Sequence, residues 1–257
     1  MPKATTLVRD FITEKLKQTF TGRESLSRQE LFDFFLQFEP DLKESTFRWR
    51  IYNLKDKNII SPISRQRFTL AHKPIFEPLI GEHERKISTL IRKRFKELKF
   101  AVWSTRIVSE FMLHQPARFI IIVEVEKVAI EPVFYYLKDS NIKDVFLDPE
   151  EKEIDRYISG LENAVVVLPL VSKAPIQGIK STATITIEKL LVDLFSDKQL
   201  FSAYQGGELA HIYDNAYRRY TINFTKLFSY ATRRRKAQDV KNFLIQKTEI
   251  PQAIFND

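Results

Sequence analysis

Hydrophobic residues recur at spacings of three and four through the first 60 residues of the chain. This spacing places apolar side chains on one face of a helix and therefore predicts helices in this region. The predicted helices cover residues 7–20, 29–38 and 45–57. Ser27 and Glu30 have the pattern of a capping box at the start of the second helix, because each side chain can bond the other residue's backbone N–H. Residues 59–63 and 67–70 alternate in character around the polar turn 64–66, which predicts a β-hairpin.

The order helix, helix, turn, helix and hairpin predicts a winged helix-turn-helix domain over residues 1–72. Residues 73–82 contain two prolines and a glycine and are predicted to form a linker. Over residues 83–257 short apolar runs alternate with helical patterns, which predicts an α/β domain with a small mixed sheet and a helical C-terminal part. The predicted strands cover residues 100–103, 119–125, 144–147, 164–168 and 182–186, and the predicted helices cover residues 83–98, 105–113, 131–137, 150–158, 187–195, 208–220, 223–231 and 237–246. The fold class is therefore α/β, or more generally α+β.

Composition narrows the choice of protein class. The chain has no cysteine, which excludes disulfides and thiolate zinc sites. Its first residues lack the apolar core of a secretory signal, and its longest apolar runs are far shorter than a membrane span; we therefore expect a soluble, cytoplasmic protein. The net charge is +5 over residues 1–75, −3 over residues 76–214 and +6 over residues 215–257. A basic excess at both ends fits a nucleic-acid partner.

The predicted third helix carries most of the residues that we expect to bind DNA. Phe47, Ile51 and Leu54 share one face and are expected in the core. The opposite face of this helix would enter the major groove, while the hairpin tip would follow the adjacent backbone or minor groove. The candidate DNA-binding residues are Ser45, Thr46, Arg48, Trp49, Arg50, Tyr52, Arg65, Gln66 and Arg67. The alternative is a winged domain that binds only protein, in which Trp49 and Tyr52 would cover a neighbouring helix.

We expect no catalytic residue, no metal and no cofactor. The four histidines are dispersed, and there is no glycine-rich phosphate loop. The alternative function is a metal-dependent nuclease that a winged-helix domain brings to DNA. It requires Glu124, Asp148 or Glu150 to converge on one metal site. Glu150 falls in the first turn of a predicted helix, where acidic residues are common because they complement the helix dipole.

Basic residues also gather on the predicted terminal helices. The candidate partner-binding residues are Arg218, Arg219, Arg233, Arg234, Arg235 and Lys236. Such a set can bind RNA, DNA or an acidic protein surface, or it can be a solvated helix end.

Three stretches of the chain, residues 45–54, 184–194 and 216–234, resemble the AbiEi-like antitoxins of bacterial abortive-infection systems, which are type IV toxin–antitoxin systems. The resemblance implies a winged helix-turn-helix before a C-terminal antitoxin domain, and negative autoregulation of a two-gene operon. It also implies neutralisation of a nucleotidyltransferase-like toxin, with or without a stable complex. Glu188 and Asp193 match the family stretch, and we interpret them as helix-start and surface or network residues, not as catalytic residues. The turn of the predicted hairpin, over residues 64–68, lacks the glycine that is often found in the wing of such domains.

Overall fold

The computed structural model describes residues 3–70 and 73–254 of the chain. They fall into two compact units. Unit 1 contains residues 1–75, 219–225 and 251–257, and unit 2 contains residues 76–218 and 226–250. Residues 71–72, where we expected the first domain to end, lie outside the described residues, and residues 73–81 contain no helix or strand. The α+β fold class predicted from the sequence is confirmed.

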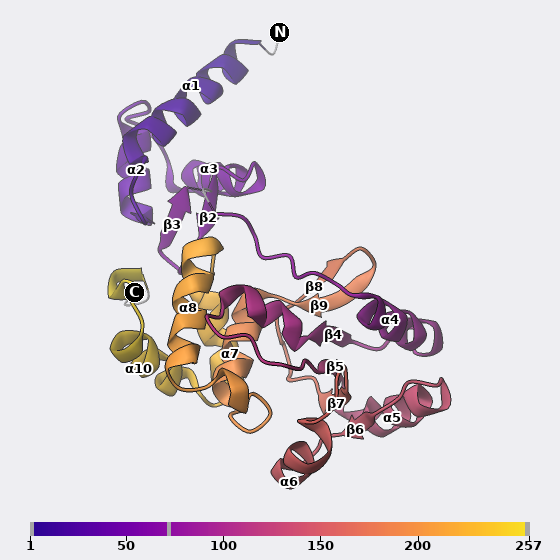
Figure 1. The fold of residues 1–257 in the computed structure, drawn as a ribbon. Coiled ribbons are helices and arrows are strands. Elements are labelled where there is room, and N and C mark those ends of the chain that lie inside the picture. The colour runs from indigo at the N-terminus through magenta and orange to yellow at the C-terminus, as the bar shows by residue number, and fades with distance from the viewer. Residues whose placement is uncertain (1–2, 71–72, 255–257) are drawn as a thin grey trace. The chain divides into compact units, whose positions relative to one another are not determined.

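Unit 1 contains the helices and the hairpin predicted for the start of the chain (Figure 1). Its helices are α1 (Lys3–Phe20), α2 (Arg28–Leu36) and α3 (Glu44–Asp56), and its strands are β1 (Leu26–Ser27), β2 (Ile60–Pro62) and β3 (Arg67–Leu70). The strands form an antiparallel sheet in the order β1-β3-β2. Leu26, Leu31, Phe47 and Ile60 are among the buried side chains that join the helices to this sheet.

The predicted capping box is confirmed at the start of α2. The Ser27 hydroxyl accepts a hydrogen bond from the Glu30 N–H at 3.0 Å, and the Glu30 carboxylate accepts one from the Ser27 N–H at 2.7 Å. Strand β1 was not predicted, because a two-residue strand has too few positions to show an alternating pattern.

Two short segments from late in the chain complete unit 1. The N–H of Thr221 donates to the carbonyl of Pro74 at 3.1 Å, and its hydroxyl donates to the carbonyl of Lys73 at 3.0 Å. The N–H of Phe224 donates to the carbonyl of Ile63, next to the turn of the hairpin. Residues 219–225 therefore bond both the turn region of the β2–β3 hairpin and the segment that follows β3.

Unit 2 is built around a four-stranded mixed sheet in the order β4-β5-β7-β6. The strands are β4 (Phe100–Ser104), β5 (Ile121–Val125), β6 (Val145–Leu147) and β7 (Val165–Pro169). β4 is antiparallel to β5, whereas β5, β7 and β6 are mutually parallel. Helices α4 (Glu82–Arg94) and α5 (Ile130–Asp139) cover one face of the sheet through Ile87, Ile91, Val133 and Leu137.

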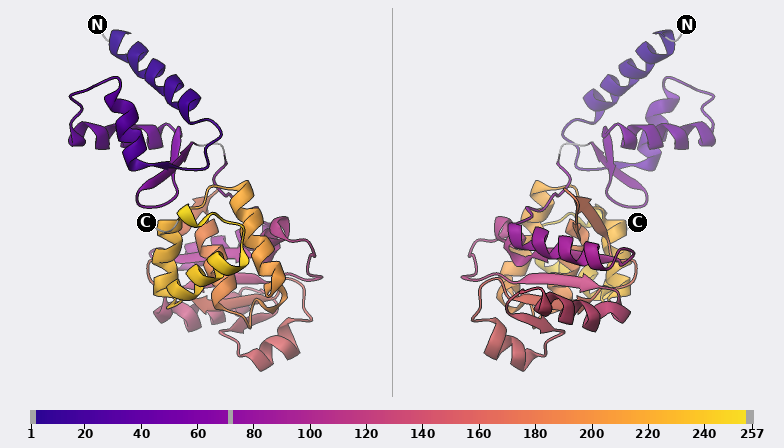
Figure 2. Two further views of the ribbon diagram at one scale, coloured as in Figure 1. Left: turned by 90° about the vertical axis from the view of Figure 1, so that its left-hand side faces the viewer. Right: turned by 90° about the vertical axis from the view of Figure 1, so that its right-hand side faces the viewer.

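Helix α7 (Ile187–Ser196) packs on the other face of this sheet, with the remaining C-terminal helices on the same side (Figure 2). These helices are α8 (Gly207–Arg219), α9 (Phe224–Arg233) and α10 (Ala237–Lys247). Almost every residue of α7 is buried. Since α7 is enclosed on nearly all sides, any polar side chain it carries needs a partner inside unit 2.

The structure corrects two helix predictions in unit 2, confirms one strand and adds another. The helix predicted over residues 105–113 is a 3₁₀ helix, η1 (Thr105–Phe111). The helix predicted over residues 150–158 is divided into a short α-helix, α6 (Glu151–Glu153), and a π-helical turn, η3 (Ile154–Ile158). The stretch 182–186 is strand β9 (Thr182–Ile185), and its hairpin partner β8 (Ile176–Ile179) was not predicted. Among the described residues no helix is both long enough and apolar enough to span a membrane.

Candidate nucleic-acid interface and the Lys189 cluster

Helix α3 has one buried face and one exposed face. Phe47, Ile51 and Leu54 are buried, which confirms the predicted core stripe. They contact the α2 and sheet side chains of unit 1 as members of one hydrophobic cluster. The remaining positions are held away from the core because the helix is fixed by this stripe.

The exposed face of α3 carries several of the predicted DNA-binding residues. They are Ser45, Thr46, Arg48, Trp49 and Tyr52. The Arg48 side chain is 75% exposed, and its Nε donates to the Glu44 carboxylate at 3.3 Å. Glu44 also accepts from Arg28, whose guanidinium lies 4.9 Å from the centre of the Phe47 ring. The hydrogen bond from Arg28, and to a smaller extent the one from Arg48, hold the pKa of Glu44 below its usual value. This carboxylate therefore stays charged between two arginines.

Arg50 lies on the flank of α3 and turns inward. It forms an ion pair with Glu39, and its guanidinium lies 5.4 Å from the centre of the Phe35 ring. Only 18% of its side chain is exposed. The structure therefore gives Arg50 a packing role, and it separates this residue from Arg48.

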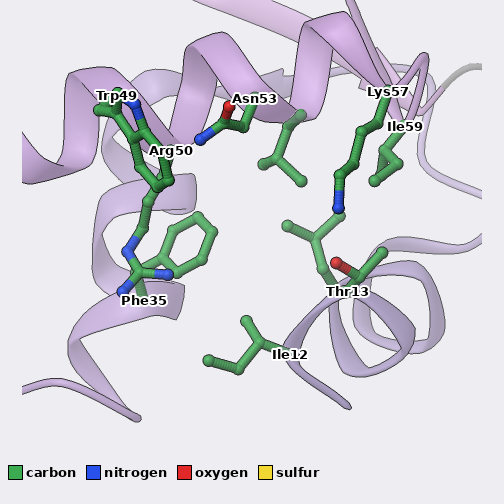
Figure 3. Close-up of a pocket in the computed structure, with 10 residues that line it drawn as sticks. Ile12, Thr13, Phe35, Trp49, Arg50, Asn53, Lys57 and Ile59 are labelled. Atoms are coloured by element: carbon green, nitrogen blue, oxygen red, sulfur yellow. The ribbon is translucent and has the colours of Figure 1, made fainter. Parts of the chain in front are cut away.

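A shallow pocket next to Arg50 is lined by side chains of α1, α2 and α3 (Figure 3). Trp49 and Asn53 lie along its α3 wall, and Ile12 and Thr13 line it from α1. The side chains of Lys57 and Thr13 point toward each other across the pocket (Figure 3). Trp49 is half exposed, and Tyr52 is more exposed still, at 65%.

The turn of the β2–β3 hairpin presents the remaining predicted DNA-binding residues. Arg65 and Gln66 are exposed, while Arg67 is half-buried and donates to the Ser25 hydroxyl at 3.3 Å. The Gln66 carbonyl accepts a hydrogen bond from the N–H of Arg28 at 2.7 Å. Arg28 therefore connects the hairpin turn with Glu44 of α3. The sequence prediction missed this residue, because its position beside α3 depends on the packing of α2.

The candidate partner-binding residues lie at the end of α8 and between the end of α9 and the start of α10. Arg218 pairs with Glu249, and both side chains are largely exposed. Arg219 is the last residue of α8. Arg233 ends α9, and Arg235 and Lys236 lie in the turn before α10.

Arg234, from the same turn, approaches a buried polar cluster in the interior of unit 2. We call this the Lys189 cluster and define it as Glu124, Lys189, Asp193 and Tyr230. The Lys189 amine donates to Glu124 at 2.7 Å, to Asp193, and to the Tyr230 hydroxyl at 3.3 Å. The Tyr230 hydroxyl donates to Asp193 at 2.8 Å. Arg234 lies 3.7 Å from Asp193, so two cations face two carboxylates.

The sheet supplies a further partner to this cluster. The indole N–H of Trp103 on β4 donates to the second oxygen of Glu124 at 3.0 Å. Burial alone would lower the pKa of Lys189, but the carboxylates of Asp193 and Glu124 outweigh it and leave that pKa raised. Burial also raises the pKa of Glu124, against the opposing effect of Lys189. The cluster is therefore a nearly closed ionic network, which agrees with the network role that we assigned to Asp193.

The nuclease alternative requires acidic side chains to converge on one metal ion. Among the described residues, no group of three or more His, Asp or Glu side chains is placed to hold a metal ion. Glu124 is bound within the Lys189 cluster, and Glu150 caps the short helix α6.

A family model described as a family of unknown function (DUF6577) matches residues 46–250. The match covers most of the chain, from within α3 to just beyond α10, and it includes the whole Lys189 cluster. None of the curated proteins matches the chain.

Proposed function

Since the chain belongs to the DUF6577 family, whose function is unknown, we propose a function from its own residues. We propose that the protein is a cytoplasmic DNA-binding regulator of its own operon and the antitoxin to a nucleotidyltransferase-like toxin. Unit 1 would act as a winged helix-turn-helix, and unit 2 as the antitoxin domain. The operator DNA and the toxin are the proposed partners.

The exposed face of α3 is the observation on which the DNA-binding proposal rests. Its side chains are polar, aromatic and basic, and its opposite face is held in the core by Phe47, Ile51 and Leu54. A helix anchored in this way can enter the major groove and place Arg48 against base edges. Arg65 and Gln66 at the hairpin turn are then available for phosphates. The charge of +5 over residues 1–75 favours association with DNA.

The antitoxin part rests on the sequence resemblance of residues 184–194 and 216–234 to AbiEi-like antitoxins. The matching positions include Asp193, and the second stretch contains Tyr230 and Arg234. In unit 2 these three residues meet in and around the Lys189 cluster. The resemblance thus falls on side chains that contact one another.

The DNA-binding proposal is tested by measuring retardation of the DNA upstream of the gene at several salt concentrations. Arg48→Ala should weaken binding by about tenfold or more, since a base contact by arginine contributes about 1–3 kcal/mol. Arg92→Ala is the matched control, because it removes an equally exposed arginine from α4 of unit 2. Equal binding by both variants, or retardation that does not change with salt, would refute the proposal.

The antitoxin proposal needs a separate experiment. The proposal requires a nucleotidyltransferase-like toxin gene in the same operon; that gene is expressed alone and together with the chain, and growth is followed. We expect arrest with the toxin gene alone and recovery with both genes. Recovery should persist with Arg48→Ala, because the two activities are assigned to different units. Failure of the chain to restore growth would overturn the antitoxin assignment and leave the DNA-binding result untouched.

A further inference from the structure

Unit 2 contains a cavity of about 310 Å³ at the amino ends of three parallel strands. Ile121 and Val165, at the starts of β5 and β7, form its floor together with Ile87 of α4. All three side chains are buried. The loop before β6 and the loop before β7 form the walls. An apolar floor with a polar rim and a volume of this size is typical of small-molecule sites.

Two lysines stand at the rim of this cavity without a protein partner. Lys86 comes from α4 and Lys143 from the loop before β6, and both are exposed. Neither side chain forms an ion pair or hydrogen bond with any residue in the part of the chain that the structure describes. The rim also carries Asp144 and Glu162, and Glu162 lies 3.7 Å from Arg106 outside the cavity. The two lysines are thus free to bind an anion.

The loops around the cavity have an unusual backbone. Asn141, Asp144 and Asn163 all have positive φ angles, of 58°, 52° and 59°, in a region that residues with a side chain rarely adopt. Hydrogen bonds hold two of these loops in place: Asn163 N–H to Phe119 O at 2.8 Å, and Val165 N–H to Asp144 O at 2.9 Å. Such conformations concentrate at ligand sites, where the surrounding structure enforces them. Asn141 and Asn163 both belong to the lining of the cavity.

We propose that this cavity binds a small molecule that carries a phosphate group and a planar heterocyclic ring, of which a nucleoside monophosphate is the simplest class. Lys86 and Lys143 would bind the phosphate, as ammonium groups commonly do. The aliphatic floor would contact the face of the ring, and the two asparagine amides would bond its polar edge. The site is independent of the DNA-binding face, since all of its residues belong to unit 2.

The experiment is calorimetric titration of the full chain with adenosine and uridine 5′-monophosphates, the two free nucleosides and inorganic phosphate. At least one nucleotide should bind at least tenfold more tightly than its nucleoside and than inorganic phosphate. The double variant Lys86→Ala/Lys143→Ala should reduce nucleotide affinity at least tenfold. Arg92→Ala/Lys93→Ala is the control, because it removes two exposed cations of α4 outside the cavity.

Three results would overturn the proposal. They are absence of binding by both nucleotides at millimolar concentration, an equal loss of affinity in the control variant, and binding of inorganic phosphate as tight as that of the nucleotides. If inorganic phosphate binds as tightly as the nucleotides, the lysines at the rim bind a free anion and the apolar floor contributes nothing to affinity. Circular dichroism of each variant distinguishes lost binding from lost folding. The outcome does not depend on DNA binding, which is measured separately.

Discussion

Glu44 is a carboxylate on the face of unit 1 that we propose binds DNA. It accepts hydrogen bonds from Arg28 and Arg48 and carries a negative charge close to where phosphates would lie. In free protein it restrains Arg48, while in a complex it would repel the DNA backbone. The negative charge of Glu44 therefore opposes the binding of DNA by Arg28 and Arg48.

Glu44→Gln should increase affinity for operator DNA by about threefold at low salt, because it removes the repulsive charge and releases Arg48. Fluorescence anisotropy with labelled operator DNA measures the change. Glu97→Gln, an exposed carboxylate of unit 2, is the control and should leave affinity unchanged. Weaker binding by Glu44→Gln would mean that Glu44 positions Arg48 for contact with DNA.

Helix α2 shows what one capping residue contributes at the scale of an element. Ser27→Ala should lower the stability of unit 1 by about 1 kcal/mol, since it leaves the Glu30 N–H without its acceptor. Urea denaturation, followed by the circular dichroism of the helices, measures the loss of stability. Ser45→Ala is the control, because Ser45 is exposed on α3 and is not its capping residue. A loss equally large in both variants would contradict a specific capping role.

The same capping box makes the stability of unit 1 depend on pH. The hydrogen bond from the Ser27 N–H lowers the pKa of Glu30. A lowered pKa in the folded state contributes stability above the unfolded value of about 4.5 and loses it as pH falls through the folded value. The wild type should therefore lose this contribution on acidification below pH about 4.5, whereas Glu30→Gln should not.

The Lys189 cluster joins α7, α9 and the sheet. Lys189→Met should destabilise unit 2 by about 3–5 kcal/mol, because it leaves Glu124 and Asp193 buried without their shared cation. Thermal unfolding measures the effect. Lys236→Met removes a cation from an exposed pair with Asp239 and should cost less than about 1 kcal/mol.

A second substitution separates the charge from the packing. Glu124→Gln in the Lys189→Met background neutralises one of the two carboxylates that lost the lysine, while keeping its acceptor oxygen for Trp103. Part of the lost stability should return. No recovery at all would indicate that the volume of the lysine side chain, and not its charge, stabilises this interior.

Local patterns predicted the elements of unit 1 well. The capping box joins residues three apart, the core stripe of α3 repeats every three or four residues, and the hairpin reverses over a short turn. Each of these features depends on residues close together in the chain. The sequence alone therefore specifies them.

Contacts between distant residues could not be predicted in the same way. The Lys189–Glu124 pair joins positions 65 residues apart, and the Arg50–Glu39 pair depends on how α3 lies against the end of α2. A lysine in an apolar helix gives no sign of its partner. For the same reason, the sequence placed Arg50 among the DNA-binding candidates and gave no hint of Arg28.

At the scale of the whole molecule, the order of the chain does not match the order of its units. Unit 1 begins the chain but also takes in residues 219–225, which follow most of unit 2. Ile222 and Phe224 from this segment are buried. The hairpin that we propose contacts DNA is therefore bonded by a residue more than 140 positions away, through Phe224 and Ile63, and Thr221 bonds Lys73 in the segment after β3.

Thr221→Val should test this support, because it removes the hydroxyl bonded to Lys73 while keeping a side chain of similar volume. A lost hydrogen bond of this kind contributes about 0.5–1.5 kcal/mol. The amides of Ile63 and Ser64, which bond Arg67 across the hairpin, should exchange faster with deuterium. Thr232→Val is the control, because its hydroxyl bonds only Phe228 within α9. Unchanged exchange at the hairpin in Thr221→Val would mean that strands β1 to β3 hold the turn by themselves, and that residues 219–225 follow the shape of unit 1 without stabilising it.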